Sequence, residues 1–224
     1  CQTALSDIEV EHEEVGGKMY HIQYPLDAGS ESLTVATTRP ETMLADTAVA
    51  VHPDDPRYNH LIGKSARLPL TDRTIPIVGD PILVDREFGT GAVKITPGHD
   101  FNDEQAGKRH KLSFENILTK EGRLVSSPRT GQFAGLTVMQ ARLQVVQALK
   151  EEGLLIDEKD HTHAVGKCYR CKSVVEPFLS TQWFVKINDP ENSLAKPAID
   201  AVLNGQIRLI PEGWKNNYLG WMEN

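Results

Sequence analysis

The stretch Gly89-Thr90-Gly91-Ala92-Val93-Lys94-Ile95-Thr96-Pro97-Gly98-His99-Asp100-Phe101-Asn102-Asp103 is the most informative part of this chain. It runs from a glycine turn through a short strand into the start of a helix. Side chains alternate along a strand, so Lys94 and Thr96 share one face and their apolar neighbours point toward a core. Lys94 and Thr96 therefore point into the space that a sheet encloses. Asp100 and Asp103 are three residues apart, so they lie on one side of the first helical turn.

From spacing alone, simpler interpretations are available. An aspartate at a helix start is a common N-cap and complements the helix dipole. Gly89-Thr90-Gly91 is typical of a tight turn. It is not a dinucleotide fingerprint, because Lys94 stands where the third glycine would be.

The composition is that of an ordinary globular chain, with 224 residues, 39% hydrophobic and 25% charged. No apolar run reaches the length of a membrane span and no leader opens the sequence, so we expect no membrane partner. The net charge of −7 argues against an extended electrostatic interface with nucleic acid. It does not exclude a site that binds only the end of a strand. Three cysteines fit a reducing compartment, and we expect the cytoplasm.

Short strand-like runs separated by Pro, Gly or Asp predict a curled sheet or barrel. The predicted strands are residues 20–26, 33–38, 47–51, 74–78, 82–84 and 92–96. Helical turns are predicted at residues 41–46 and after Asp100. Apolar residues at helical spacing predict an amphipathic helix over residues 136–152.

We therefore predict a mixed α and β fold, predominantly β, with flanking helices. Residues 1–160 would form the core, with a linker at its start. A charged turn at residues 157–160 would precede a small unit at residues 161–187, and residues 188–224 would connect to a further domain.

A second segment, Thr37-Thr38-Arg39-Pro40-Glu41-Thr42, follows a strand-like run. Together the two segments resemble the threonine-rich and acidic peptides of the editing domains in class I aminoacyl-tRNA synthetases. Among the valine, isoleucine and leucine branches, the valine branch is most similar. The isoleucine branch typically has glycine where Asp100 stands, and the leucine branch lacks the sequence Lys94-Ile95-Thr96. The resemblance covers most of the chain and implies a closed, barrel-like editing core.

The same resemblance assigns the site. Asp100 would anchor the α-ammonium of a misattached amino acid, and Asp103 would accept a hydrogen bond from a threonine hydroxyl. The catalytic candidates are Asp100, Lys94 and Thr38, and the substrate-binding candidates are Asp103, Thr96, Arg39, Phe88 and Thr37. An aminoacyl ester carries a cation beside a carbonyl, so its hydrolysis needs a carboxylate, donors for an oxyanion and room for water. It needs no protein nucleophile, and a general-base role for His99 is not favoured.

There are two departures from the valine branch. Gly98 stands where alanine is usual, and Glu104-Gln105-Ala106 replaces an aromatic-acidic-aliphatic run.

Cys168-Tyr169-Arg170-Cys171 fits a redox pair, half of a zinc site or two buried thiols. We favour half of a structural zinc site within a zinc-ribbon-like unit. Family members often carry a second C-x-x-C upstream of the editing domain, and Cys1 stands where its last cysteine would fall.

The implied function is hydrolysis of threonine from mischarged tRNA for valine, with pre-transfer editing as an added activity. We expect no cofactor for hydrolysis, ATP use only in the parent enzyme, and no amino-acid activation by this chain. The expected partners are the 3′ end of aminoacylated tRNA for valine and the rest of the synthetase, and the chain is expected to be a monomer. Isoleucine or leucine specificity, or a non-catalytic module that binds the tRNA end, remain the alternatives.

Overall fold

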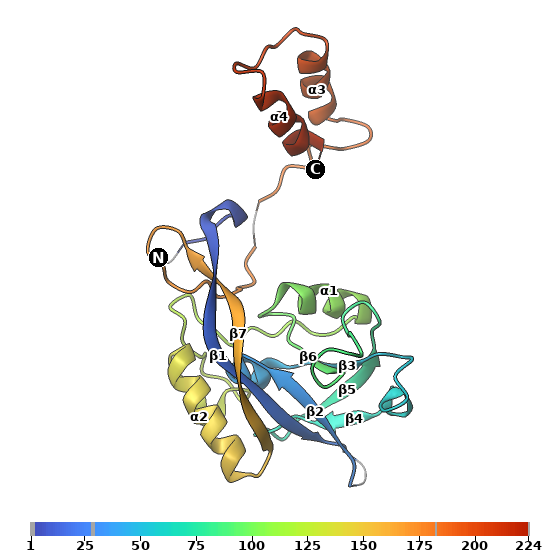
Figure 1. Ribbon diagram of the computed structural model, residues 1–224, viewed down its shortest axis with the longest axis vertical. Coiled ribbons are helices and arrows are strands. Elements are labelled where there is room, and N and C mark those ends of the chain that lie inside the picture. Colours follow the sequence, from blue (N-terminus) through green and yellow to red (C-terminus); the bar gives the residue numbers. More distant parts are fainter. Residues whose placement is uncertain (1–2, 28–29, 182, 224) are drawn as a thin grey trace. The chain divides into compact units, whose positions relative to one another are not determined.

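The computed structural model describes residues 3–27, 30–181 and 183–223. The chain forms two compact units, Cys1–Leu179 and Ser180–Asn224 (Figure 1). This division differs from the predicted one. Strand β7 (Leu155–Cys168) crosses the predicted boundary at residue 160 and pairs with the core sheet, so residues 161–168 belong to the first unit.

The first sheet has the order β2-β1-β7. Its central strand is β1 (Val10–Pro25), which pairs antiparallel with β2 (Ser32–Thr37) and with β7. The predicted charged turn at residues 157–160 is wrong, because these residues lie within β7. The part of the ribbon in which residues 10–18 of β1 pair with residues 160–168 of β7 is largely exposed to solvent. Charged side chains can therefore form cross-strand pairs there, such as Lys18–Asp160 at 2.7 Å.

The second sheet has the order β4-β5-β3-β6. Its strands are β4 (Ser65–Arg67), β5 (Thr74–Gly79), β3 (Ala48–Val51) and β6 (Ala92–Ile95). Strands β3 and β5 are parallel, and β3 and β6 are antiparallel.

The predicted strand at residues 82–84 is wrong, because this segment is a turn. The Asp80 carboxylate accepts hydrogen bonds from the amides of Ile82 and Leu83, both at 3.0 Å, and so curls the backbone.

The two sheets approach each other at two places. Leu26, beyond β1, forms a bridge with Ala66 of β4, and β2 runs close to β6. Within the part of the chain that the structure describes, no ladder joins β2 to β6, so the predicted closed barrel is not found. After β2 the chain enters the 3₁₀ helix η2 (Pro40–Ala45), which begins with Pro40, a residue well suited to the first turn of a helix.

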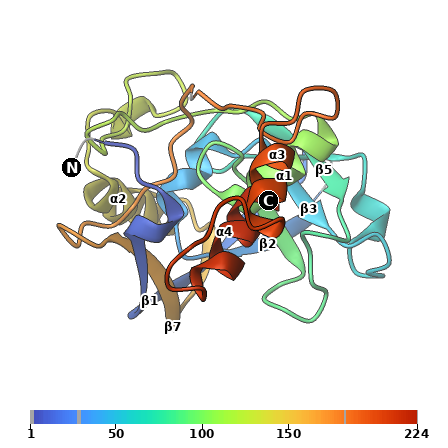
Figure 2. The same ribbon diagram turned by 90° about the horizontal axis from the view of Figure 1, so that it is seen from above.

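Two helices pack on the first unit (Figure 2). Helix α2 (Val138–Glu151) confirms the predicted amphipathic helix, and it buries Ala141, Val145 and Leu149 in the main core. Helix α1 (Phe101–His110) lies beside β6 over a smaller apolar cluster. Short 3₁₀ helices are η1 (Asp7–Glu9), η3 (Asn59–Leu61) and η4 (Gly131–Phe133).

The second unit contains α3 (Ala195–Leu203) and α4 (Trp214–Glu223). The Tyr218 hydroxyl donates to the Ala198 carbonyl at 3.3 Å and links the two helices. Across the described ranges of both units, no helix has the length and apolar character needed to cross a membrane.

Gly98 has no room for a side chain, which gives a test of the packing. A Cβ on Gly98 would lie 2.1 Å from the backbone oxygen of Glu115, so Gly98→Ala must displace backbone. We expect a loss of about 1–3 kcal/mol in the free energy of unfolding, measured with urea. Gly16→Ala is the matched control, because nothing lies within 4 Å of its Cβ position. Equal unfolding midpoints for the two variants would contradict this packing.

Candidate active site

The threonine-rich segment turns the chain at the end of β2. The Thr37 hydroxyl accepts a hydrogen bond from the Arg39 amide at 3.1 Å. The Thr42 hydroxyl donates to the Arg39 carbonyl at 3.0 Å. Thr37 is buried, and Thr38 is half-buried. These bonds fix the backbone of Arg39 beside the opening between the two sheets.

A fully buried carboxylate, Asp46, lies against β6. It accepts hydrogen bonds from the Tyr24 hydroxyl at 2.8 Å and the Thr96 hydroxyl at 2.6 Å, and Lys94 Nζ lies 3.3 Å from Oδ1. Burial raises the pKa of Asp46, and these three partners act in the opposite direction. The sequence analysis missed Asp46 and Tyr24. The available signal was an aspartate isolated between two apolar runs.

The ammonium group of Lys94 is surrounded by protein acceptors. It donates to Thr42 Oγ1 at 3.1 Å, to Asp46 Oδ1 at 3.3 Å, and to Thr96 Oγ1. An ammonium has three N–H donors, so all of them are used in this arrangement. Lys94 therefore orders Thr96 and Asp46, and in this state it has no N–H group for a ligand.

The acidic helix start brings two carboxylates to β6. Asp100 is the N-cap of α1, and its Oδ1 accepts from the amides of Asn102 at 2.8 Å and Asp103 at 3.1 Å. Asp103 is buried, and its Oδ2 accepts from the Thr96 amide at 2.8 Å. The structure thus brings Asp103, Thr96 and Lys94 together, with Asp100 exposed at the edge.

Asp103 titrates unusually for a carboxyl group. Burial raises its pKa from 3.8 to about 7, and the Asp100 charge adds to this, while Lys94 acts in the opposite direction. Near neutral pH, the protonated and ionised forms of Asp103 are therefore both populated.

His99 is buried and neutral. Its Nε2 accepts a hydrogen bond from the Ile117 amide at 3.1 Å. Burial lowers its pKa to about 3, and the nearby cations Arg39 and Lys94 add to this. Because the Nε2 lone pair is occupied and the ring is a weak base, the geometry gives His99 a structural role.

Arg39 sits among groups from distant parts of the chain. Its Nη1 donates to the His99 carbonyl at 2.9 Å, its Nη2 pairs with Glu176, and its Nε lies 3.5 Å from Glu41. Glu41 also forms two hydrogen bonds with Arg142, each at 2.8 Å. Glu176 and Arg142 were missed, because they lie 137 and 101 positions from their partners and no local pattern links them.

Phe88 is 67% exposed, on the loop before β6. Hydrogen bonds hold the loop on both sides of Phe88. Arg57 Nη2 donates to the Arg86 carbonyl at 3.0 Å, and the Tyr58 hydroxyl donates to the Thr90 carbonyl at 3.1 Å. The loop therefore presents an aromatic ring to solvent, and such a ring can stack on a nucleobase.

The cysteine pair lies at the end of β7. Cys168 is buried, and Ser173 hydrogen bonds lower the pKa of Cys171 to about 6. The Cys168 amide bonds back to the Ser173 carbonyl at 2.9 Å, which makes a tight turn continuous with the ribbon and not a separate zinc-ribbon unit. Among the described residues, no three His, Cys, Asp or Glu side chains gather as metal ligands. Cys1 lies outside the described residues, so the zinc site stays a prediction.

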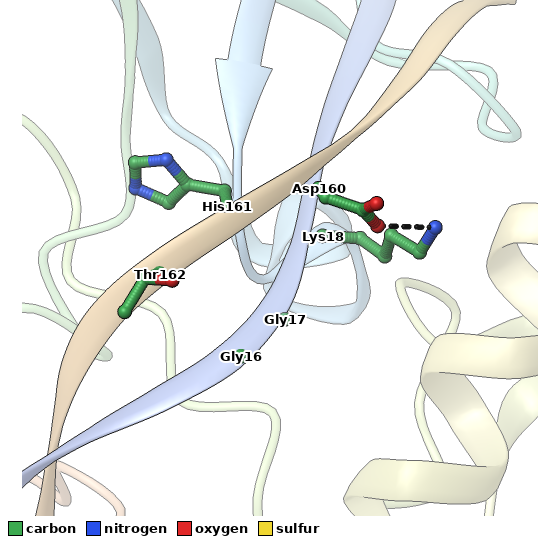
Figure 3. A pocket seen from close by; sticks show the side chains of 6 residues that line it. All are labelled: Gly16, Gly17, Lys18, Asp160, His161 and Thr162. Carbon is green, nitrogen blue, oxygen red and sulfur yellow. Dashed lines mark ion pairs between the residues drawn. The ribbon is translucent and has the colours of Figure 1, made fainter.

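A hollow on the β1–β7 ribbon contains none of the predicted site residues. It is lined by Gly16, Gly17, Lys18, Asp160, His161 and Thr162 (Figure 3). The Lys18–Asp160 ion pair joins the two strands beside it, and Gly16 and Gly17 add no side chains to it.

Comparisons with known proteins cover the whole chain. The sequence profile of "tRNA synthetases class I (I, L, M and V)" matches residues 1–224. A valine–tRNA ligase from Carboxydothermus hydrogenoformans is 54% identical over 224 residues, which are 100% of this chain and 25% of that protein. A valine–tRNA ligase from Bdellovibrio bacteriovorus is 53% identical over 100% of this chain and 24% of its own length. The chain therefore spans about a quarter of the length of the curated relatives it matches.

Similarity to solved structures is weaker. The crystal structure titled GlLeuRS-CP1 has a TM-score of 0.47 and 15% sequence identity, and the match covers 65% of this chain and 98% of that one.

The raised pKa of Asp103 predicts a pH-dependent stability. The folded-state pKa of about 7 exceeds the unfolded value, so the stabilising effect of the protonated form is complete below about pH 4 and is lost as the pH rises through about 7. Asp103→Asn removes this titration. Relative to the variant, the wild type should lose up to about 4 kcal/mol of unfolding free energy between pH 4 and pH 8. Urea unfolding across this range measures the difference.

Asp54→Asn is the control, because Asp54 is an exposed carboxylate outside the site. Parallel pH profiles for the wild type and Asp103→Asn would show that Asp103 is not desolvated in the folded chain.

Proposed function

The chain belongs to the class I tRNA synthetases, and from this premise we propose that it hydrolyses threonine from mischarged tRNA for valine. The reaction adds water across the ester that joins threonine to the terminal ribose. Its products are threonine and tRNA with a free hydroxyl. The remainder of a cytoplasmic valine–tRNA ligase would be its covalent partner, and ATP would be used only there.

The need for such an activity follows from the chemistry of the substrates. A pocket sized for valine cannot strongly reject threonine, which has a hydroxyl in place of a methyl group. This pair is a standard example of the limit, with discrimination of about a hundredfold. A second site that selects the hydroxyl by hydrogen bonding would remove the remaining errors.

The observation that carries the proposal is the position of Asp103. One of its oxygens accepts a hydrogen bond from the Thr96 amide, and the Thr96 hydroxyl is in turn bound by Lys94. Among the described residues, no hydrogen-bond donor lies on its other oxygen. A carboxylate oxygen without a protein partner, on a side chain that is otherwise buried, can accept a hydrogen bond from a substrate hydroxyl.

The charge around the candidate site supports a cationic substrate. Five carboxylates, Glu41, Asp46, Asp100, Asp103 and Glu176, accompany only three cations, Arg39, Lys94 and Arg142. An aminoacyl ester carries an α-ammonium group, which an acidic surrounding favours. Asp100 stands at the edge of this group with one oxygen in the helix cap, so its other oxygen can meet the ammonium.

The proposed roles follow from these positions. Asp100 binds the ammonium and Asp103 binds the threonine hydroxyl. Phe88 and Arg39 receive the terminal adenosine, with Thr37 and Thr38 along the same edge. Lys94 acts through Thr96, because its own N–H groups are used within the protein.

A deacylation assay tests the proposal directly. The purified chain should release threonine from threonyl-tRNA for valine faster than it releases valine from the correctly charged tRNA. Isoleucine- or leucine-type editing would instead show preference for other misattached amino acids. Binding of charged tRNA without release of either amino acid would support the non-catalytic alternative.

Asp100 can be tested without disturbing its structural role. Asn is as good an N-cap as Asp, so Asp100→Asn keeps the helix start and removes the charge. We expect hydrolysis of both threonyl-tRNA and valyl-tRNA to fall by about one to two decades, because the ammonium is common to both. The urea midpoint should stay near that of the wild type. Wild-type rates in this variant would exclude Asp100 as the anchor.

Asp103 should instead control selectivity. In Asp103→Ala the threonine hydroxyl loses its acceptor, so threonyl-tRNA hydrolysis should fall by about one to two decades, the size of one charge-assisted hydrogen bond. Residual valyl-tRNA hydrolysis should change little, and single-turnover rates on the two substrates measure the ratio. Loss of the Thr96 amide bond would affect both substrates alike. An equal fall on both would therefore assign Asp103 a structural or catalytic role.

A further inference from the structure

Glu176 reaches the candidate site from beyond the cysteine turn. Its segment is fixed to β7, because Val174 forms a bridge with Lys167 and the Val175 amide donates to the Gly166 carbonyl at 2.9 Å. The Glu176 carboxylate pairs with Arg39, and these two side chains are 23% and 26% exposed. The pair is therefore largely withdrawn from water but still accessible from the site.

Neighbouring carboxylates compensate the positive charge of Arg39. Glu176 and Glu41 lie on two sides of its guanidinium, and the second guanidinium nearby, Arg142, is bound by Glu41. Two guanidinium groups and two carboxylates together form a neutral group. A guanidinium has five N–H donors, and three of its nitrogens have one partner each here, so two N–H groups remain for a ligand.

This arrangement changes what Arg39 can recognise. An uncompensated arginine at an RNA end would bind a phosphate, because guanidinium and phosphate match in charge and shape. A phosphate placed here would meet the Glu176 carboxylate at short range, in a low-dielectric setting where repulsion is strong. A hydroxyl or a ring nitrogen would meet no such repulsion.

We infer that Glu176 is a specificity-determining residue: by neutralising Arg39, it restricts that side chain to an uncharged part of the RNA end, a ribose hydroxyl or a base edge, and keeps phosphate away. This inference rests on the proposed function, and it names the part of the substrate that Arg39 receives. Glu176 itself acts through Arg39, as a positioning group on the same guanidinium.

The test uses two probes that differ only by a phosphate. They are the amide-linked, non-hydrolysable analogue of 3′-threonyl-adenosine and the same compound with a 5′-phosphate. Calorimetry gives their affinities for the whole chain. The wild type should bind the phosphorylated probe no more tightly than the other. Tighter binding of the phosphorylated probe by tenfold or more would overturn the inference without any variant.

Glu176→Gln removes the charge and keeps the shape. We expect this variant to favour the phosphorylated probe by about tenfold relative to wild type, the effect of one screened charge at close range. The gain should shrink as salt rises from 50 to 500 mM, because the screening length falls. An unchanged probe preference in a folded Glu176→Gln variant would overturn the inference.

Glu121→Gln is the matched control, since it makes the same change in net charge at an exposed loop position. It should leave the preference as in the wild type, and an equal gain there would overturn the inference by showing a global charge effect. Threonyl-tRNA hydrolysis is measured separately. Loss of hydrolysis with the predicted probe preferences rejects only the proposed reaction, whereas normal hydrolysis with an unchanged preference rejects only the role of Glu176.

Discussion

The buried carboxylate of Asp46 holds together a sheet structure that does not close by backbone hydrogen bonds. A buried charge is costly unless donors surround it, and Asp46 is bound by Tyr24 of β1 and by Lys94 and Thr96 at β6. These bonds join the first sheet to the second across the opening where no described residues form a ladder. Side-chain hydrogen bonds thus replace backbone pairing at the place where a site needs space.

The same interaction determines the electrostatics of the site. Because the ammonium of Lys94 is bound by Asp46, Thr42 and Thr96, it compensates only part of the charge on Asp103. Burial therefore dominates, and the pKa of Asp103 reaches about 7. An incoming ammonium would favour the ionised form. In the proposed reaction, substrate binding and the readiness of Asp103 to accept a hydroxyl are thus coupled.

The sequence predicted the local elements near the site, because strand alternation and helix starts depend on neighbouring residues. Lys94 and Thr96 share one face of β6, as strand alternation indicated, and the contact between Asp103 and Thr96 agrees with what the family resemblance implied. The sequence did not predict the start of β7, because its charged residues look like a solvated turn until they are seen paired with β1. Nor could it show Glu176, whose partner lies 137 positions away. Such contacts are properties of the assembled fold and leave no local pattern.

The two aspartates of the helix start show how one motif can supply two functions. Asp100 is exposed, and its Oδ1 is held by two backbone amides at the positive end of α1, a setting that favours negative charge. Asp103 is one turn further on and buried, where the neutral form is favoured. Identical side chains can therefore differ in role through environment alone. An exposed carboxylate at the rim suits a substrate cation, and a buried side chain with one unoccupied oxygen suits a neutral hydroxyl. Asp100 can therefore cap the helix with Oδ1 and bind the substrate ammonium with its other oxygen at the same time.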